Sequence, residues 1–477
     1  MDEKLVTINP DGSNEDMAKS MADDVVTAII DHLSNLNRRR VLIPSDHQPE
    51  VSSPLSWEET LSYIQDVIAQ SMQVAHPHFF GHMDSGPLFI SVLADWVTSA
   101  LNQNMLSHEL SPLATKIEEE VIRWLCERCG YESGEGTLVS GGTMANFTGL
   151  LLALHQVTGG QFRQEGIWAL SKKPLIFTSD QSHYSITKAA AGAGLGEKSV
   201  VKVQTDERFR MDVDALGRAI QQAKDDGKLP LMVIATAGTT STGSVDPLDE
   251  IATVCNEHKL WLHVDAAHGG GALFSDGARS KLVGNERADS ITIDPHKWLM
   301  QPKGMGICIT SHDGLLSSLF QADAPYLQRG AICTPTSHGG MTFQGSRRFD
   351  ALRLWVTRLH LGDDGIRELV DHGRRQVEMW QALLKERNCF ELAHEPDLNL
   401  MCFRYRPGGL TDDELNMLNE QIPRELMLSG KGFVSITTLR GKRWLRSVFL
   451  NPSTAEKDMR VVMEVIERVG HQLQKAI

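Results

Sequence analysis

The sequence predicts an α/β fold whose mostly parallel sheet is covered by helices on both faces. Short apolar runs rich in β-branched residues recur between residues 175 and 310, and amphipathic stretches separate several of them. Strands that are apolar along their whole length are typical of a parallel sheet buried on both faces. The length of 477 residues and the 41% hydrophobic content also exclude a disordered chain or a small disulfide scaffold.

The expected strands and helices alternate along this central part. The expected strands are Leu175–Thr178, Val200–Val203, Leu231–Thr236, Leu260–Asp265, Ser290–Asp294 and Met305–Thr310. Helical patterning covers residues 212–223 and 247–258, and in the second stretch Leu248, Ile251 and Cys255 fall on one helical face. Ligands of such sheets bind beyond the carboxyl ends of the strands, so we expect the site there.

Three regions are expected. Residues 1–85 are polar, with helical patterning over 17–36 and 57–72, and their apolar content is too small for an independent core. Residues 86–335 form the large α/β domain. Residues 336–477 read as a smaller α+β domain, with a helix over 361–384 and strands near 400–405 and 445–450.

Charge and cysteine content restrict the partners and the compartment. The net charge of −14 would repel nucleic acid, and no run reaches the roughly 18 apolar residues of a membrane span. The first residues lack the basic and apolar regions of a secretory signal. Seven scattered cysteines predict free thiols, and the Cys126–Cys129 pair has no second pair that would complete a zinc site. We therefore expect a cytoplasmic protein without a metal, a membrane partner or a nucleic-acid partner.

A carboxylate and a lysine follow two neighbouring strands. One strand ends at Asp265, and the next leads into Asp294-Pro-His-Lys297. Taken singly, Asp265 reads as a turn residue and Lys297 as a surface charge. Together they are the two groups that an aldehyde cofactor with a pyridine ring requires, because lysine forms a Schiff base and a buried carboxylate keeps the ring nitrogen protonated.

Further polar groups are expected at the same edge. The run from Thr137 to Phe147 reads as a strand, a Gly-Gly turn and a helix start, whose free N–H groups can bind a phosphate. His183 follows the strand at 175–178, where its imidazole could stack on an aromatic ring. Thr236-Ala-Gly-Thr-Thr places hydroxyl groups at the end of another strand.

With these motifs in order, the chain resembles the pyridoxal-phosphate-dependent (group II) amino-acid decarboxylases, a family that includes glutamate, cysteine sulfinate, diaminobutyrate and aromatic-amino-acid decarboxylases. The segments His263-Val-Asp-Ala-Ala and Asp294-Pro-His-Lys-Trp, about 30 residues apart, carry the resemblance, which extends from His76 to Pro452. It implies the fold of the aspartate aminotransferase type (fold type I), with a seven-stranded, mostly parallel sheet, and a homodimer with shared active sites in which the N-terminal segment packs on the partner.

The resemblance also implies roles for individual residues. Lys297 would form the Schiff base with pyridoxal 5'-phosphate, and Asp265 would pair with the pyridinium nitrogen. Ala267 would pack beneath the ring and His183 would stack above it. The segment 445–452 matches the one whose arginine, here Arg446, binds the substrate α-carboxylate, a task suited to a bidentate guanidinium.

The phosphate end of the cofactor has its own expected contacts. Backbone amides would hold the phosphate, and a histidine and a threonine would lie near the cofactor. These residues are Gly142, Thr143, Met144, His296 and Thr239.

Two segments, 79–85 and 100–108, resemble those that line the family's side-chain pocket. The expected substrate contacts in them are His82, Asp84, Ser85, Asn104 and Leu106. The second segment is most like the glutamate and cysteine sulfinate branch, but His82 and Asp84 replace its glutamine and serine. Because a carboxylate disfavours an acidic substrate and favours an amine or a polar aromatic ring, acidic, diamino and aromatic substrates all stay open.

The family's mobile loop carries a tyrosine that protonates the substrate carbon after carbon dioxide leaves. No tyrosine occurs here between Tyr326 and Tyr405, and His338 falls closest to the expected place. Imidazole can donate a proton near neutral pH, so His338 is a candidate catalytic residue. Relatives without the tyrosine can release an aldehyde, and an aldehyde synthase is therefore the alternative to amine formation. A transaminase or a cofactor-holding scaffold fits the motifs less well.

Overall fold

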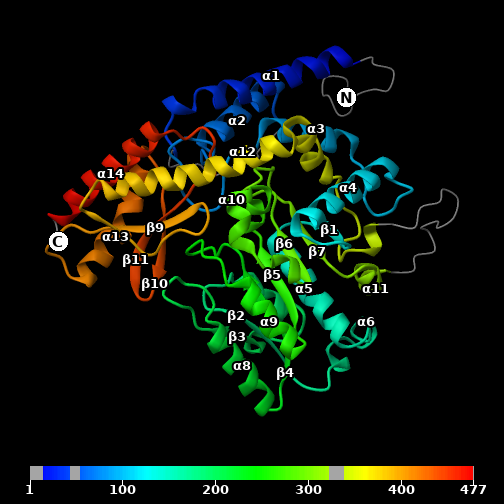
Figure 1. The fold of residues 1–477 in the computed structure, drawn as a ribbon. Coiled ribbons are helices and arrows are strands. Elements are labelled where there is room, and N and C mark those ends of the chain that lie inside the picture. Colours follow the sequence, from blue (N-terminus) through cyan, green and yellow to red (C-terminus); the bar gives the residue numbers. More distant parts are fainter. Residues whose placement is uncertain (1–13, 43–53, 322–337, 476–477) are drawn as a thin grey trace.

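A computed structural model describes residues 14–42, 54–321 and 338–475. Two sheets organise these residues, a large one of seven strands and a small one of four (Figure 1). The expected α/β class is therefore confirmed, with the smaller sheet toward the C-terminus.

The large sheet has the strand order β1-β7-β6-β5-β4-β2-β3. Strands β2 to β6 run parallel, whereas β7 is antiparallel to both β6 and β1. Since β1 and β6 both oppose β7, β1 points in the same direction as the parallel strands. The strands of the large sheet are β1 (Glu135–Val139), β2 (Pro174–Ser179), β3 (Val200–Val203), β4 (Leu229–Thr236), β5 (Trp261–Ala266), β6 (Ser290–Ile293) and β7 (Gly306–Thr310).

Helices cover both faces of this sheet because successive side chains of a strand point to opposite sides. On β4, Ile234 packs in the cluster that contains α5 (Gly142–Val157) and α7 (Ser185–Gly192). Its neighbour Val233 packs in the other cluster, with α8 (Val213–Asp225) and α9 (Leu248–His258). The two expected helices of this region are thus confirmed as α8 and α9.

The small sheet has the order β10-β11-β9-β8 and is antiparallel. Helices α13 (Asp412–Ser429) and α14 (Glu456–Gln474) pack with this sheet around a separate apolar core. The strands of the small sheet are β8 (Phe390–Leu392), β9 (Leu400–Tyr405), β10 (Ser435–Leu439) and β11 (Lys442–Val448). The long helix α12 (Ala351–Lys385) extends along both parts (Figure 1). It starts ten residues before the expected helix and is kinked at Gly362, where φ is 64°.

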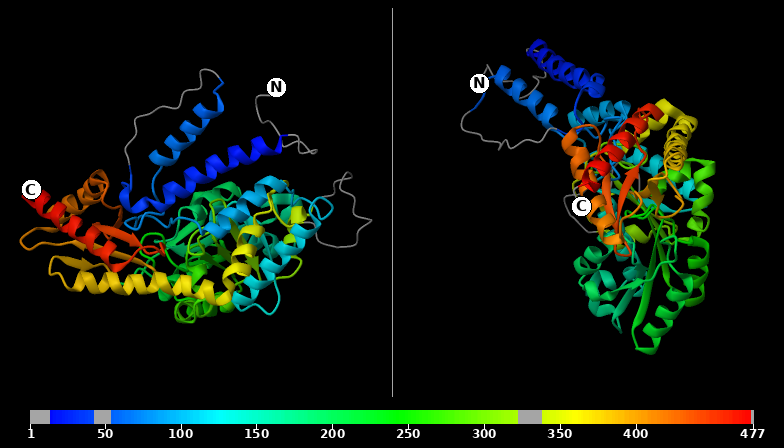
Figure 2. Two further views of the ribbon diagram at one scale, coloured as in Figure 1. Left: turned by 90° about the horizontal axis from the view of Figure 1, so that it is seen from above. Right: turned by 90° about the vertical axis from the view of Figure 1, so that its left-hand side faces the viewer.

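The N-terminal helices lie outside the body of the chain. Helices α1 (Glu15–Ser34) and α2 (Trp57–Gln70) form a pair that extends away from the two sheets (Figure 2). A capping box of Ser56 and Glu59 begins α2, and no residue of α2 is buried. The remaining helices are α3 (Phe89–Leu101), α4 (Pro112–Cys129), α6 (Phe162–Glu165), α10 (Asp276–Arg279) and α11 (Leu315–Phe320).

Among the described helices, none is both long and apolar enough to cross a bilayer. The six cysteines in the described ranges are free thiols. Burial raises the pKa of Cys126 to about 12, which leaves it an unreactive thiol.

Candidate active site

A cavity of about 310 Å³ lies at the carboxyl edge of the large sheet, where loops after β1, β2, β4, β5 and β6 meet. Its wall contains eight of the nine residues expected to bind the cofactor, namely Gly142, Thr143, Met144, His183, Asp265, Ala267, His296 and Lys297. Thr239 is the exception: its buried hydroxyl bonds to that of Thr242 (2.5 Å), while Gly238 and Thr240 on either side of it reach the wall. The cavity is completed by Met83, Ser140, Gly141, Asn146, Thr236, His268 and Asp294.

Asp265 is held in place by a buried chain of hydrogen bonds. Its Oδ2 accepts from Nδ2 of Asn146 (2.8 Å), and its Oδ1 accepts from the N–H of Ala267 (3.2 Å). Nδ2 of Asn146 donates to the carboxylate, so Oδ1 of Asn146 must accept a hydrogen bond from Nε2 of His263 (3.0 Å). This contact fixes the tautomer of the His263 ring. Burial lowers the pKa of His263 to about 4, so the ring stays neutral. The side-chain amide of Asn146, itself held by His263, therefore fixes the position of one carboxylate oxygen of Asp265.

We expect Asn146→Ala to reduce kcat about ten- to a hundredfold. A hydrogen bond to a charged group contributes about 1.5–3 kcal/mol, and each 1.36 kcal/mol corresponds to a factor of ten in rate. Steady-state kinetics checks this expectation. Asn146→Asp, which keeps the size but cannot donate an N–H to the carboxylate, should lose at least as much activity, and unchanged kcat in both variants would remove Asn146 from the support of Asp265.

The start of α5 forms a cradle without side chains. Gly141 has φ of 147°, and a Cβ on Gly142 would lie 2.7 Å from Oδ2 of Asp294, so the turn requires glycine. The N–H of Met144 donates to the carbonyl of Gly141 (3.0 Å) and is not available to a ligand. The amides of Gly142 and Thr143, at the positive end of the helix, are left to bind an anion.

The wall histidines His183 and His296 are neutral. Burial lowers the pKa of His183, and its Nδ1 accepts from the N–H of Ser185 (3.3 Å), so the proton lies on Nε2. Burial also lowers the pKa of His296, whose Nδ1 donates to the carbonyl of Met305 (2.5 Å). Neutral rings in the cavity wall suit stacking and hydrogen bonding better than charge compensation.

Lys297 is paired with a carboxylate other than Asp265. Its Nζ lies 3.1 Å from Oδ2 of Asp294, the residue that follows β6. Sequence reasoning treated Asp294 only as part of a motif, although its position directly after a buried strand was a sufficient signal. Asn146 was missed because an asparagine on a helix carries no chemical signature of its own.

Arg446, on β11, contacts the wall residue Thr240, and one of its guanidinium nitrogens has no hydrogen-bond partner among the described residues. Its Nε donates to the carbonyl of Thr240 (2.6 Å) and Nη1 to Oγ of Ser435 (3.1 Å), whereas Nη2 is buried and has no partner among the described residues. Burial lowers the pKa of Arg446 to about 10. An unpaired, buried donor beside a wall residue is suited to an incoming carboxylate.

The first expected substrate segment lies near this arginine. Arg446 lowers the pKa of His82, after the larger effect of burial, and Asp84 raises it. Asp84 forms an ion pair with Lys303, so its charge is compensated. The argument that Asp84 disfavours an acidic substrate is weakened by this pair. Oγ of Ser85 is buried without a partner in the described part of the chain.

The other expected contacts gather at a different place, outside the cavity wall. Asn104 Oδ1 accepts from the N–H of Leu106 (3.0 Å), and the carbonyl of Leu106 accepts from the N–H of Gly339 (3.1 Å). His338 is 2% exposed, and its Nδ1 lies 3.6 Å from Oε1 of Glu118, which also pairs with Arg347. We call Asn104, Leu106 and His338 the second cluster. The rest of the loop, residues 322–337, lies outside the described residues.

Known proteins resemble this chain in both sequence and structure. The conserved domain of pyridoxal-dependent decarboxylases matches residues 40–406. An acidic amino acid decarboxylase of Xenopus tropicalis is 34% identical over 87% of this chain and 83% of its own length. An aromatic-L-amino-acid decarboxylase of Bacillus atrophaeus is 32% identical over 97% of both chains. The crystal structure of mouse CSAD in its apo form, 30% identical, covers 95% of this chain and 99% of its own with a TM-score of 0.90. The fold and the site define an enzyme of the pyridoxal-phosphate class, and the chain belongs to the pyridoxal-dependent decarboxylase family.

The residues present fit this cofactor. The glycine cradle would take the phosphate, Lys297 the aldehyde and Asp265 the ring nitrogen, and Ala267 and His183 both line the cavity between these ends. The resemblance inferred from the sequence and the cofactor that it implied are confirmed, whereas the roles of the individual residues stay proposals.

Proposed function

We propose that this enzyme removes the α-carboxylate of an L-amino acid as carbon dioxide and releases the corresponding amine. The observation that carries the proposal is one cavity with Lys297 and Asp265 in its wall and the unpaired Nη2 of Arg446 behind it. An amine, an acid and a carboxylate-binding cation are the groups that this reaction needs.

Each protein group has a defined task. Arg446 binds the substrate carboxylate and orients the bond that breaks. Asp265, fixed by Asn146, keeps a proton on the ring nitrogen. Bound pyridoxal phosphate supplies a conjugated ring that accepts the electron pair of the broken bond. The buried wall excludes water and so strengthens these electrostatic contacts.

Carbon dioxide release tests the function. The twenty protein amino acids, with diaminobutyrate, ornithine and cysteine sulfinate, are each incubated with holoenzyme while carbon dioxide and amine are measured. We expect one or a few of them to give both products in equal amounts. A 2-oxo acid formed with an added acceptor would indicate a transaminase, and no turnover with any substrate would contradict the proposal. The substrate class is read from the same screen.

The absence of tyrosine between Tyr326 and Tyr405 favours a second candidate, an aldehyde synthase. If His338 protonates the substrate carbon, His338→Phe shifts the product from amine toward aldehyde. Dioxygen is the oxidant of this alternative reaction, which also consumes water and releases hydrogen peroxide and ammonia with the aldehyde and carbon dioxide. Chromatography of the products measures this ratio. An unchanged ratio together with a lower Tm would instead assign His338 to the buried contact with Glu118.

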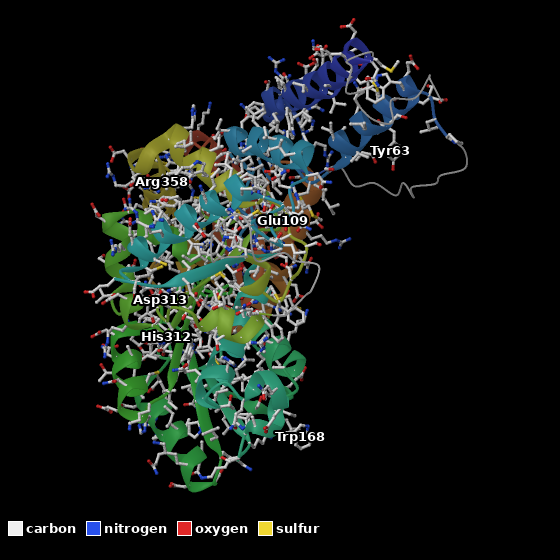
Figure 3. The ribbon with its side chains drawn as sticks, turned by 90° about the vertical axis from the view of Figure 1, so that its right-hand side faces the viewer. Tyr63, Glu109, Trp168, His312, Asp313 and Arg358 are labelled. Carbon is white, nitrogen blue, oxygen red and sulfur yellow. The ribbon has the colours of Figure 1, made fainter. Side chains whose placement is uncertain are left out.

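We infer that the functional unit is a homodimer. Helix α3 exposes Phe89, Leu93, Trp96, Val97 and Leu101 between 37% and 55%, and their spacing places them on one face. Helix α2 has no buried residue, and Tyr63 stands on it away from the body of the chain (Figure 3). Apolar surface of this extent marks an interface, and a second copy supplies a matching surface by two-fold symmetry. The second cluster is our candidate for the part of the partner's site that each chain contributes.

Light scattering tests the dimer. The wild type should show twice the chain mass of 52.8 kDa. Trp96→Glu should give monomers, because a charge in the apolar face opposes its burial. The matched control is Trp168→Glu, since Trp168 is 87% exposed and stands on the short 3-10 helix Gly166–Ala169 after α6, at the other end of the molecule (Figure 3). A wild-type monomer would contradict the proposal.

The free thiols support a cytoplasmic location, because reduced cysteines persist in a reducing compartment.

A further inference from the structure

Asp294 is a second buried carboxylate of the cavity wall, and the chemistry proposed above does not use it. It follows the last residue of β6, and its side chain is 3% exposed. The N–H of Lys297 donates to its carbonyl (3.0 Å), which closes a tight turn. This turn brings Oδ2 within 3.1 Å of Nζ of Lys297.

Lys297 is the nearest cationic group to this carboxylate. Nε2 of His296 lies 3.8 Å from Oδ2, but that ring is neutral, since burial lowers its pKa and Nδ1 carries the proton that bonds to Met305. Oδ1 of Asp294 has no partner among the described residues. The ion pair with Lys297 is therefore the principal interaction that compensates a buried negative charge.

The two carboxylates of the cavity differ in their surroundings. Both oxygens of Asp265 accept hydrogen bonds, from Asn146 and from the backbone of Ala267. Asp294 has no such support and contacts the lysine amine directly. Two hydrogen bonds thus hold the carboxylate of Asp265 in place. The carboxylate of Asp294, in contrast, is held by its ion pair with Nζ of Lys297.

We propose that Asp294 is a positioning residue for Lys297: its carboxylate holds the lysine as an ammonium ion, and this ammonium donates a proton to the substrate carbon that loses carbon dioxide. The proposal rests on the proposed function and goes beyond it, because it names the source of the proton.

The protons and electrons balance over one cycle. With the cofactor bound, Nζ would carry one proton in its bond to the aldehyde carbon. The substrate ammonium would replace Nζ on that carbon and would give up two protons, which would leave Nζ as an ammonium ion. The bond to the carboxylate then breaks, carbon dioxide leaves, and the electron pair stays with the substrate. Nζ gives its proton to the substrate carbon and becomes a neutral amine, whose lone pair displaces the product amine.

Other donors in the cavity wall are less suited to this step. In the described part of the wall, Lys297 is the one lysine or arginine side chain. Burial lowers the pKa of His183, and it lowers that of His268 to about 3, so both rings are neutral near pH 7. A neutral imidazole is a weaker acid than an imidazolium ion.

Lysine reactivity in cofactor-free protein tests the ion pair. The apoenzyme is treated with a trace of acetic anhydride at pH 7, and acetylation of Lys297 is measured by peptide mass spectrometry. Lys303, which pairs with Asp84, is the internal reference. We expect Asp294→Asn to raise the labelling of Lys297 at least about fivefold relative to Lys303, since Nζ then lacks the carboxylate with which it pairs. Asp294→Glu, which keeps the charge, is the matched control and should label as the wild type does.

A single turnover of reloaded holoenzyme tests the proton step. In Asp294→Asn, carbon dioxide should be released at the wild-type rate, whereas amine formation should slow at least about tenfold. Unchanged labelling of Lys297 would overturn the proposal, as would equal slowing of both products. A wild type that releases no carbon dioxide would contradict the proposed function, while the labelling would still report on the ion pair.

Discussion

Lys297→Ala should abolish turnover and the visible absorbance of covalently bound cofactor. Nζ of Lys297 is the only lysine nitrogen in the described cavity wall, and without it no covalent link to the aldehyde can form. Absorbance spectroscopy and mass spectrometry of the borohydride-reduced protein check both parts. The loss should be complete within detection, because no other described residue of the wall supplies a primary amine.

Lys303→Ala is the control for this result. Lys303 is six residues further along the chain, and its exposed side chain pairs with Asp84. This variant should keep the covalent cofactor. If Lys297→Ala kept the absorbance band of covalently bound cofactor, a different lysine would carry the cofactor. The assignment of Lys297 as the Schiff-base lysine would then be wrong.

Asp265→Ala should lower kcat by about three orders of magnitude, which corresponds to about 4 kcal/mol of lost transition-state stabilisation. The reason is that the ring nitrogen loses the anion that keeps it protonated, so the ring accepts the electron pair of the broken bond less well. The buried position of Asp265, at 4% exposure, prevents water from replacing the carboxylate. Steady-state rates of carbon dioxide release measure the effect.

Asp289→Asn is the matched control. Asp289 precedes β6 at the opposite edge of the sheet, where its carboxylate accepts from the N–H of Leu262 (2.7 Å) and pairs with His312. Asp289 and the cavity residue Asp294 lie at opposite ends of β6, so kcat should be unchanged. Near-normal kcat in Asp265→Ala would mean that another acid protonates the ring.

The large sheet could be predicted from the sequence because its strands are continuous apolar runs. Leu231–Thr236 and Ser290–Asp294, for example, differ from β4 and β6 by one or two residues at their ends. Strand β1 was recognised for its phosphate turn, but its antiparallel pairing with β7 depends on contacts across nearly 170 residues, which local patterns do not contain.

The site was predictable where a residue type follows a strand end, as for Asp265, Lys297 and His183. It was less predictable where a side chain acts through others. The ion pair of Lys297 with Asp294, the support of Asp265 by Asn146 and the compensation of Asp84 by Lys303 all depend on distances that only the folded chain sets. The burial of His338 beside Glu118 belongs to the same group.

The contact of Arg446 with Thr240 joins the small sheet to the large one at the cavity. If the proposed roles hold, residues before 311 carry the reactive groups of the cavity, and the C-terminal sheet carries the arginine that binds the substrate carboxylate. Divergence in residues 390–448 would then change how the α-carboxylate common to all amino acids is held, without replacing the reactive groups. Chimaeras that exchange this segment between relatives would separate the binding of the α-carboxylate from the choice of side chain.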